Sequence, residues 1–220
     1  MLFLKTTDKI KIAADFYSAP VPIGYLLLLH MMPATKESWR TFAETMQGRG
    51  YTSLAIDLRG HGQSEDGPDG YKSFSDRVHQ KSIHDLDAAV RFLEEQGATA
   101  DRIILIGASI GANVSLKYLV KNPEYKKAVL LSPGLNYRGL QGEVLAKKLR
   151  SDQRLLIVAS RDDERPDGNA AEFAQTVFEA LPGKEASSLI IYGAGGHGTE
   201  LLAIEGEESV LAKILPFIKT

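Results

Sequence analysis

Short runs of apolar residues recur along the whole chain, and stretches with amphipathic helical spacing separate them. Several runs are apolar throughout, which is typical of strands covered on both faces by helices. The pattern predicts strands at Ile10–Phe16, Leu26–Leu29, Ser53–Ile56, Ile103–Ile106, Ala128–Leu131, Leu155–Ala159 and Leu189–Tyr192. It predicts helices at Lys36–Gln47, Phe74–Glu95, Ile110–Lys121, Ala170–Leu181 and near Glu207–Ile218.

This alternation predicts an α/β fold with a mostly parallel, doubly wound sheet and right-handed crossovers. The opening segment, FLKTTDKIKIAADFY, alternates polar and apolar residues around a turn at Thr7-Asp8. It therefore predicts an antiparallel hairpin at the amino terminus, at one edge of the sheet. Because the sequence has no internal repeat, low-complexity tract or linker, we expect residues 1–220 to form a single domain.

The composition of the chain excludes several classes of partner and of chemistry. With 44% hydrophobic and 25% charged residues, the 220-residue chain has the composition of an ordinary soluble globular protein. A formal charge of −2 indicates neither nucleic acid nor an anionic membrane as a partner, and it leaves the oligomeric state open. The chain has no cysteine, no secretory signal and no segment long enough to span a bilayer, so we expect a cytoplasmic protein without thiolate chemistry.

The candidate catalytic residues lie just after the apolar runs, where ligands bind in open α/β sheets. The stretch GASIG places Ser109 between Gly107 and Gly111, after one predicted strand and before a predicted helix. A tight strand-to-helix turn exposes a serine hydroxyl, and the amino terminus of the helix favours developing negative charge. The alternative is a turn of small residues with no chemistry.

A serine nucleophile needs a base, and His197 is the only histidine that follows Ser109 in the chain. It lies in the glycine-rich loop GAGGHG, directly after the last predicted strand. A third group should orient the imidazole, and Asp162 and Asp163 follow a strand between the two. Spacing alone does not choose between these aspartates.

Five segments together resemble the α/β-hydrolase superfamily, and in particular small lidless serine carboxylesterases. They are GASIG, DLRGHGQS (57–64), LLLLHMMPATKESW (26–39), IVASRDD (157–163) and GAGGHG (193–198). The resemblance covers essentially the whole chain and implies a sheet of about eight strands with helices on both faces. It also implies Ser109 as nucleophile, His197 as base and Asp163, three residues after Ser160, as the acid. No metal or organic cofactor is implied.

The resemblance further implies an oxyanion hole made by the backbone N–H groups of Ile110 and Met32. Met31 stands where the family usually has glycine, so this loop departs from the common pattern. Side chains of Met31 and Met32 next to the serine suggest a substrate-binding acyl pocket, with core filling as the alternative. His30 and His61 resemble structural members of their loops and are given no catalytic role.

For other residues near these segments we expect structural roles. Only Ser132 to Arg154 separates two strands where many family members carry a lid, which leaves room for one short helix. We expect no lid, or a minimal one, and therefore a shallow site. Residues for which packing is the expected role, with lining of the cleft as the alternative, are Tyr71, Phe74 and Tyr137. Residues expected to be solvated or capping within a helix are His79 and His84.

The sequence thus predicts a serine hydrolase that cleaves short-chain carboxylic esters through an acyl-enzyme intermediate, acting on a small-molecule substrate. A thioesterase or another acyl hydrolase would use the same residues. A non-catalytic hydrolase-fold protein that binds a small ligand or a partner is the alternative from another class. A peptidase is less favoured, because nothing resembles the added domain with which such enzymes bind peptides.

Overall fold

The computed structural model describes residues 1–219, which form an eight-stranded sheet of order β1-β2-β4-β3-β5-β6-β9-β12. The strands of this sheet are β1 (Leu2–Lys5), β2 (Lys11–Tyr17), β3 (Gly24–Leu29), β4 (Tyr51–Ile56), β5 (Ile103–Ala108), β6 (Lys127–Leu131), β9 (Arg154–Ser160) and β12 (Ser188–Tyr192). β1 pairs with β2, and β2 with β4, in antiparallel register, while every other pairing in the sheet is parallel. The predicted α/β class, mostly parallel sheet and antiparallel amino-terminal hairpin are confirmed.

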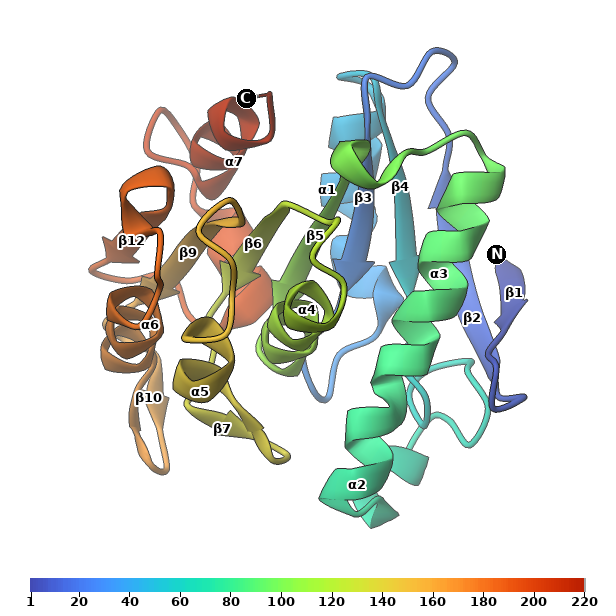
Figure 1. Ribbon diagram of the computed structural model, residues 1–220, viewed down its shortest axis with the longest axis horizontal. Helices are drawn as coiled ribbons and strands as arrows, with labels where there is room; N and C mark the ends of the chain where they lie inside the picture. Colours follow the sequence, from blue (N-terminus) through green and yellow to red (C-terminus); the bar gives the residue numbers. More distant parts are fainter. Residues whose placement is uncertain (220) are drawn as a thin grey trace.

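Helices cover both faces of the sheet (Figure 1). They are α1 (Arg40–Gln47), α2 (Asp76–His79), α3 (Ile83–Glu95), α4 (Ile110–Lys121), α5 (Gly142–Ala146), α6 (Ala170–Glu179) and α7 (Val210–Lys219). α3, α4, α5 and α6 contribute to one apolar cluster, whereas α1 and α7 contribute to a second cluster on the opposite face. No helix within residues 1–219 is long and apolar enough to cross a membrane.

The central strand β3 shows why the apolar runs are continuous. Leu27 and Leu29 belong to the first cluster, and Leu26 and Leu28 belong to the second. Successive side chains of a strand point to opposite faces, so a strand buried on both faces needs apolar residues at every position. All four leucines are fully buried.

The segment predicted as one helix at Phe74–Glu95 is broken, so that prediction was wrong. Phe74 is extended, α2 is a single turn, a 3₁₀ turn spans Gln80–Ser82, and the long helix α3 begins only at Ile83. The apolar spacing does not distinguish a 3₁₀ turn from an α-turn over three residues. The prediction for His79 was also wrong: its side chain is buried and packs at 5.6 Å, edge to face, against Phe74.

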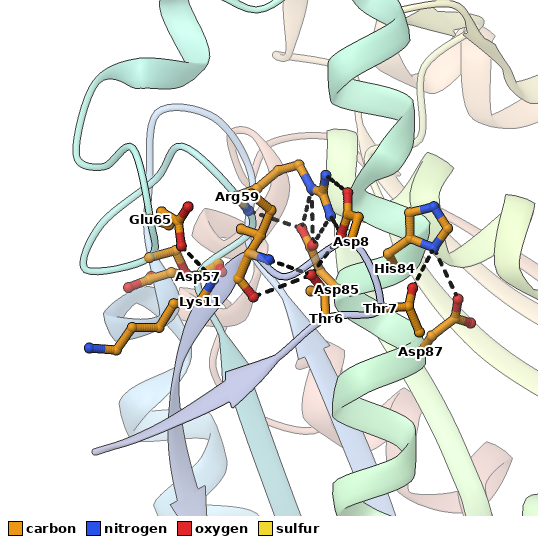
Figure 2. Close-up of polar contacts among 12 residues, drawn as sticks. Thr6, Thr7, Asp8, Lys11, Asp57, Arg59, Glu65, His84, Asp85 and Asp87 are labelled. Atoms are coloured by element: carbon orange, nitrogen blue, oxygen red, sulfur yellow. Dashed lines mark hydrogen bonds and ion pairs between the residues drawn. The ribbon is translucent and has the colours of Figure 1, made fainter.

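A buried ion cluster ties the amino-terminal hairpin to the main fold (Figure 2). The guanidinium of Arg59, which follows β4, lies between Asp8 of the hairpin turn and Asp85 of α3. Its Nη1 is 2.8 Å from Asp8 Oδ2, and its Nη2 is 2.7 Å from Asp85 Oδ1. The Arg59 N–H also donates to Asp85 Oδ2 at 3.0 Å. Arg59 therefore joins three elements that are distant in the sequence.

Two short hairpins extend the edge of the sheet at which the parallel strands end, the lower edge in Figure 1. One is β7 (Asn136–Tyr137) with β8 (Leu140–Gln141), and the other is β10 (Glu164–Arg165) with β11 (Gly168–Asn169). Strands of two residues are too short to show an alternating pattern, so the sequence did not indicate them. Between β6 and β9 the chain forms only the first hairpin and α5.

Candidate active site

Ser109 occupies a sharp turn between β5 and α4. Its φ of 54° and ψ of −116° lie in a region that a residue with a side chain rarely adopts. A Cβ at position 107 would overlap the backbone of Gly111, and a Cβ at position 111 would overlap the carbonyl oxygen of Leu29. The two glycines of GASIG are therefore required because backbones approach each other closely on both sides of the serine. Ser109 itself is 4% exposed.

His197 is carried by the loop that follows β12. This loop lies against the Ser109 turn, since a Cβ at Gly198 would be 3.3 Å from the Cβ of Ala108. The Gly198 N–H donates to Ser132 Oγ at the end of β6 at 3.0 Å, and the His197 N–H donates to Glu200 Oε2 at 2.7 Å. The histidine loop is thus fixed over the ends of β5 and β6, next to the serine.

Asp163, after the end of β9, contacts the imidazole directly. Its Oδ2 is 2.5 Å from His197 Nδ1, and its side chain is buried. Hydrogen bonding at Nδ1 places the proton on that nitrogen and the lone pair on Nε2. The His197 Nε2 atom is buried and has no hydrogen-bond partner within the described part of the chain. The imidazole can therefore accept a proton at Nε2.

The neighbouring Asp162 has a different position. Its exposed carboxylate accepts hydrogen bonds from the N–H groups of Gly195 and Gly196 at 3.1 and 3.2 Å. The Ser160 hydroxyl and these N–H groups lower its pKa, because they favour the charged form. Of the two aspartates, one holds the backbone of the histidine loop and the other contacts the imidazole itself.

The two N–H groups predicted as an oxyanion hole belong to a helix start and to a loop after a strand. Ile110 is the first residue of α4, and Met32 lies in the loop after β3. Neither N–H donates a backbone hydrogen bond among residues 1–219. Unpaired N–H groups at a helix start and in an adjacent loop can bind a developing oxyanion.

The two methionine side chains diverge. Met31 packs with the second apolar cluster, and its sulfur lies where a side chain on Gly198 would need space. The Thr199 hydroxyl is 3.9 Å from the same sulfur. Met32 packs against the first cluster, on the other face of the sheet. The Met31 side chain therefore packs against the histidine loop and fills space that a glycine at position 31 would leave empty.

His30 fixes the loop that carries both methionines. Its Nδ1 donates to the Met31 carbonyl oxygen at 2.8 Å, and its Nε2 accepts from the Leu58 N–H at 3.0 Å. Complete burial lowers the pKa of His30 to about 3, so the ring is neutral at physiological pH. His61 lies 4.8 Å from this ring and stacks on Tyr71 at 4.1 Å. Both histidines have structural contacts.

Asp57 anchors the same loop from β4. Its Oδ1 accepts the Lys36 N–H at 2.7 Å and its Oδ2 accepts the Gln63 N–H at 2.9 Å, while the buried Lys36 Nζ lies 3.4 Å from Oδ2. The chain passes so close that a Cβ at Gly62 would overlap the carboxylate. The segment DLRGHGQS therefore holds the loop that carries Met32 in place.

The sequence did not indicate Arg165, and it favoured plain packing for Tyr137. Arg165 Nη1 lies 3.6 Å from Asp163 Oδ1. The Tyr137 hydroxyl is buried, and it has no hydrogen-bond partner within residues 1–219. Burial raises the pKa of Tyr137, and the nearby Ser109 hydroxyl and Arg165 guanidinium oppose that rise. Both residues belong to the two short hairpins, where no sequence pattern marks them.

Comparisons with known proteins agree with this architecture. The sequence model of the family described as serine aminopeptidase, S33, matches residues 20–194. The AB hydrolase superfamily protein YisY of Bacillus subtilis (strain 168) is 24% identical over 132 residues, which are 59% of this chain and 44% of that protein. The chain therefore spans less than half of the length of this relative.

Two solved esterases share the fold over nearly all of this chain. The esterase EaEST from Exiguobacterium antarcticum superposes with a TM-score of 0.76 at 16% identity, covering 99% of both chains. The Pyrococcus furiosus esterase Pf2001 superposes with a TM-score of 0.78 at 20% identity, covering 99% of this chain and 89% of that one.

Proposed function

The chain belongs to the serine aminopeptidase S33 family of α/β hydrolases, and from this premise we propose that it is a serine hydrolase of short-chain carboxylic esters. One observation carries the proposal: Asp163 lies 2.5 Å from His197 Nδ1, which leaves the buried Nε2 without a partner, in a loop that packs against the strained turn of Ser109. A base with a free lone pair next to a serine is what acyl transfer requires.

In the proposed reaction, Ser109 Oγ attacks the carbonyl carbon of the ester while His197 Nε2 takes the hydroxyl proton. The N–H groups of Ile110 and Met32 bind the oxyanion of the tetrahedral intermediate. His197 then gives its proton to the departing alkoxide, and the C–O bond to the alcohol breaks. A water molecule, deprotonated by His197, attacks the acyl-enzyme, and the acid leaves as Ser109 regains its proton.

Asp163 would stabilise the imidazolium that forms in both steps. Asp162 would act through the backbone, since it holds Gly195 and Gly196 and thus the loop that presents the histidine. Substrate size enters through the segment between β6 and β9, which forms only a two-stranded hairpin and α5. We therefore propose a lidless site suited to short acyl chains.

The test is hydrolysis of p-nitrophenyl acetate, butyrate and longer esters by the purified chain and by Ser109→Ala. Ser115→Ala is the matched control, because Ser115 is a buried serine of α4 whose hydroxyl only bonds the Gly111 carbonyl oxygen of its own helix. We expect Ser109→Ala alone to lose turnover and fluorophosphonate labelling. Wild-type protein that is neither active nor labelled would refute the proposal and favour a non-catalytic binding protein.

Amide hydrolysis is the second candidate, and the family description favours it, since it names an aminopeptidase. The same serine, histidine and aspartate would serve. Aminoacyl p-nitroanilides separate the two activities: we expect kcat/KM for esters to exceed that for anilides by orders of magnitude. Comparable values would assign the chain to the peptidases, and a preference for acyl thioesters over esters would make it a thioesterase.

A further inference from the structure

A cavity of about 300 Å³ adjoins the candidate active site between the two short hairpins. Its walls come from both hairpins and from α6. No sequence pattern indicates that these elements lie together. The lining residues are Gly134, Leu135, Asn136, Tyr137, Arg165, Pro166, Asp167 and Phe173. The candidate catalytic residues follow the strand ends at the lower edge of the sheet in Figure 1, and the hairpins labelled β7 and β10 lie below that edge.

Tyr137, which lines this cavity, carries a buried hydrogen-bond donor without a partner in the described part of the chain. The Tyr137 hydroxyl is buried and unpartnered among residues 1–219, although Ser109 and Arg165 are both near it. A buried hydroxyl without a partner costs free energy, and a ligand atom that accepts its proton removes that cost. The hydroxyl therefore marks where a polar group of a bound substrate would lie, close to the serine.

Arg165 supplies positive charge to the same wall. Its guanidinium carries five N–H donors, and the ion pair described for it is a long one, 3.6 Å to Asp163 Oδ1. Asp163 is already engaged by His197 at 2.5 Å. Asp167 lines the cavity too, but within the described residues no ion pair joins it to Arg165. Arg165 is about one-third exposed and has only this long ion pair within residues 1–219, so a ligand carboxylate can approach its guanidinium.

Resting on the proposed ester hydrolysis, we propose that this cavity binds a carboxylate carried by the substrate, with Arg165 pairing the carboxylate and Tyr137 donating to it. A planar guanidinium matches the two oxygens of a carboxylate. Leu135, Pro166 and Phe173 supply an apolar wall for the short carbon chain that joins the carboxylate to the ester. The substrates are then monoesters of dicarboxylic acids or esters of hydroxy acids, rather than neutral esters.

The test compares esters that differ by one carboxylate. Monoethyl adipate is paired with ethyl hexanoate, and the butyrate ester of glycolic acid is paired with ethyl butyrate, so that the charge lies on the acyl side or on the alcohol side. Acid release is followed by pH-stat titration. We expect kcat/KM to favour the charged ester of at least one pair by about tenfold or more, as a charge-assisted hydrogen bond allows. The pair with the larger preference identifies whether the bound carboxylate belongs to the acyl part or to the alcohol part of the ester.

The variants are Arg165→Met, Arg165→Lys, Tyr137→Phe and, as the control of opposite charge, Asp167→Asn. Arg165→Met should abolish the preference, Arg165→Lys should restore part of it, Tyr137→Phe should reduce it, and Asp167→Asn should keep or increase it. The ratio within a pair is the readout, because a disturbed Asp163 would slow both esters alike. Added salt should lower the ratio, since Arg165 is about one-third exposed.

Equal hydrolysis of charged and neutral esters would overturn the inference and leave the proposed function intact. If no ester is hydrolysed, the proposed function fails, and binding decides the inference separately. For that purpose, calorimetric titration of monoethyl adipate into Ser109→Ala should show binding that ethyl hexanoate lacks and that Arg165→Met removes. Absence of binding by both esters would refute the carboxylate site.

Discussion

Changing Asp163 to asparagine removes one negative charge from the partner of His197 while it keeps the size of the side chain. In the proposed reaction, the imidazole becomes positively charged as it takes the serine proton. The Asp163 oxygen then lies 2.5 Å from a cationic ring, in a buried position. Asparagine cannot stabilise that charge, and its amide can also hold the wrong tautomer of the ring.

The contact sets the expected magnitude. Opposite unit charges about 3 Å apart attract by roughly 5 kcal/mol at an effective dielectric constant of about 20. One factor of ten in rate corresponds to about 1.4 kcal/mol, so Asp163→Asn should lower kcat by three to four orders of magnitude. Asp162→Asn keeps an acceptor for the N–H groups of Gly195 and Gly196, and the weaker neutral hydrogen bonds should cost less than about tenfold.

The assay is p-nitrophenyl butyrate turnover at neutral pH for both variants, with thermal unfolding to verify that each is folded. Asp162→Asn is the matched control, since it removes the same charge one residue away. An equal, small loss of activity in both variants, or a larger loss in Asp162→Asn, would contradict the role assigned to Asp163. Either result would assign the orienting acid to another residue.

Three predictions concern stability, each measured by urea unfolding. His30 has a pKa of about 3 in the folded protein against an ordinary 6.5, so the unfolded chain binds the proton first as the pH falls. The free energy of unfolding should therefore fall from pH 6.5 downward by up to about 1.4 kcal/mol per pH unit. A pH-independent free energy of unfolding, or an unchanged pH dependence in His30→Gln, would contradict this. Gly111→Ala should destabilise by about 3 kcal/mol or more through overlap with the β3 backbone, whereas Gly193→Ala, which has open space, should be nearly neutral. Arg59→Met should cost about 3–5 kcal/mol because it leaves Asp85 buried and unpaired, and adding Asp85→Asn should recover part of the loss; full additivity would argue against the pair.

The sequence alone was sufficient for the layers of the fold. Leu26 to Leu29 of β3 are all apolar because helices cover both faces of the sheet, and that local pattern is visible in the sequence alone. The bounds of α4 agree with the predicted Ile110–Lys121, because the glycine-rich turn before it marks where the helix begins. By contrast, helical spacing over residues 74–95 hid a 3₁₀ turn and the burial of His79, since both depend on packing.

For the site, the order of Ser109, Asp163 and His197 was visible as residues at strand ends, and their catalytic roles stay predictions. Which aspartate contacts the imidazole depends on the geometry of the turn after β9, where Asp162 meets the loop backbone and Asp163 meets the ring.

Only the tertiary structure brought Tyr137 and Arg165 together. They are 28 positions apart, in hairpins of two-residue strands, and neither has a local pattern that predicts contact with the other. A periodic pattern reports which face of an element is buried, whereas a cavity arises where separate elements fail to fill space between them. The sequence therefore determined the sheet and its candidate nucleophile, and the packing of the two hairpins decided the shape and charge of the cavity beside it.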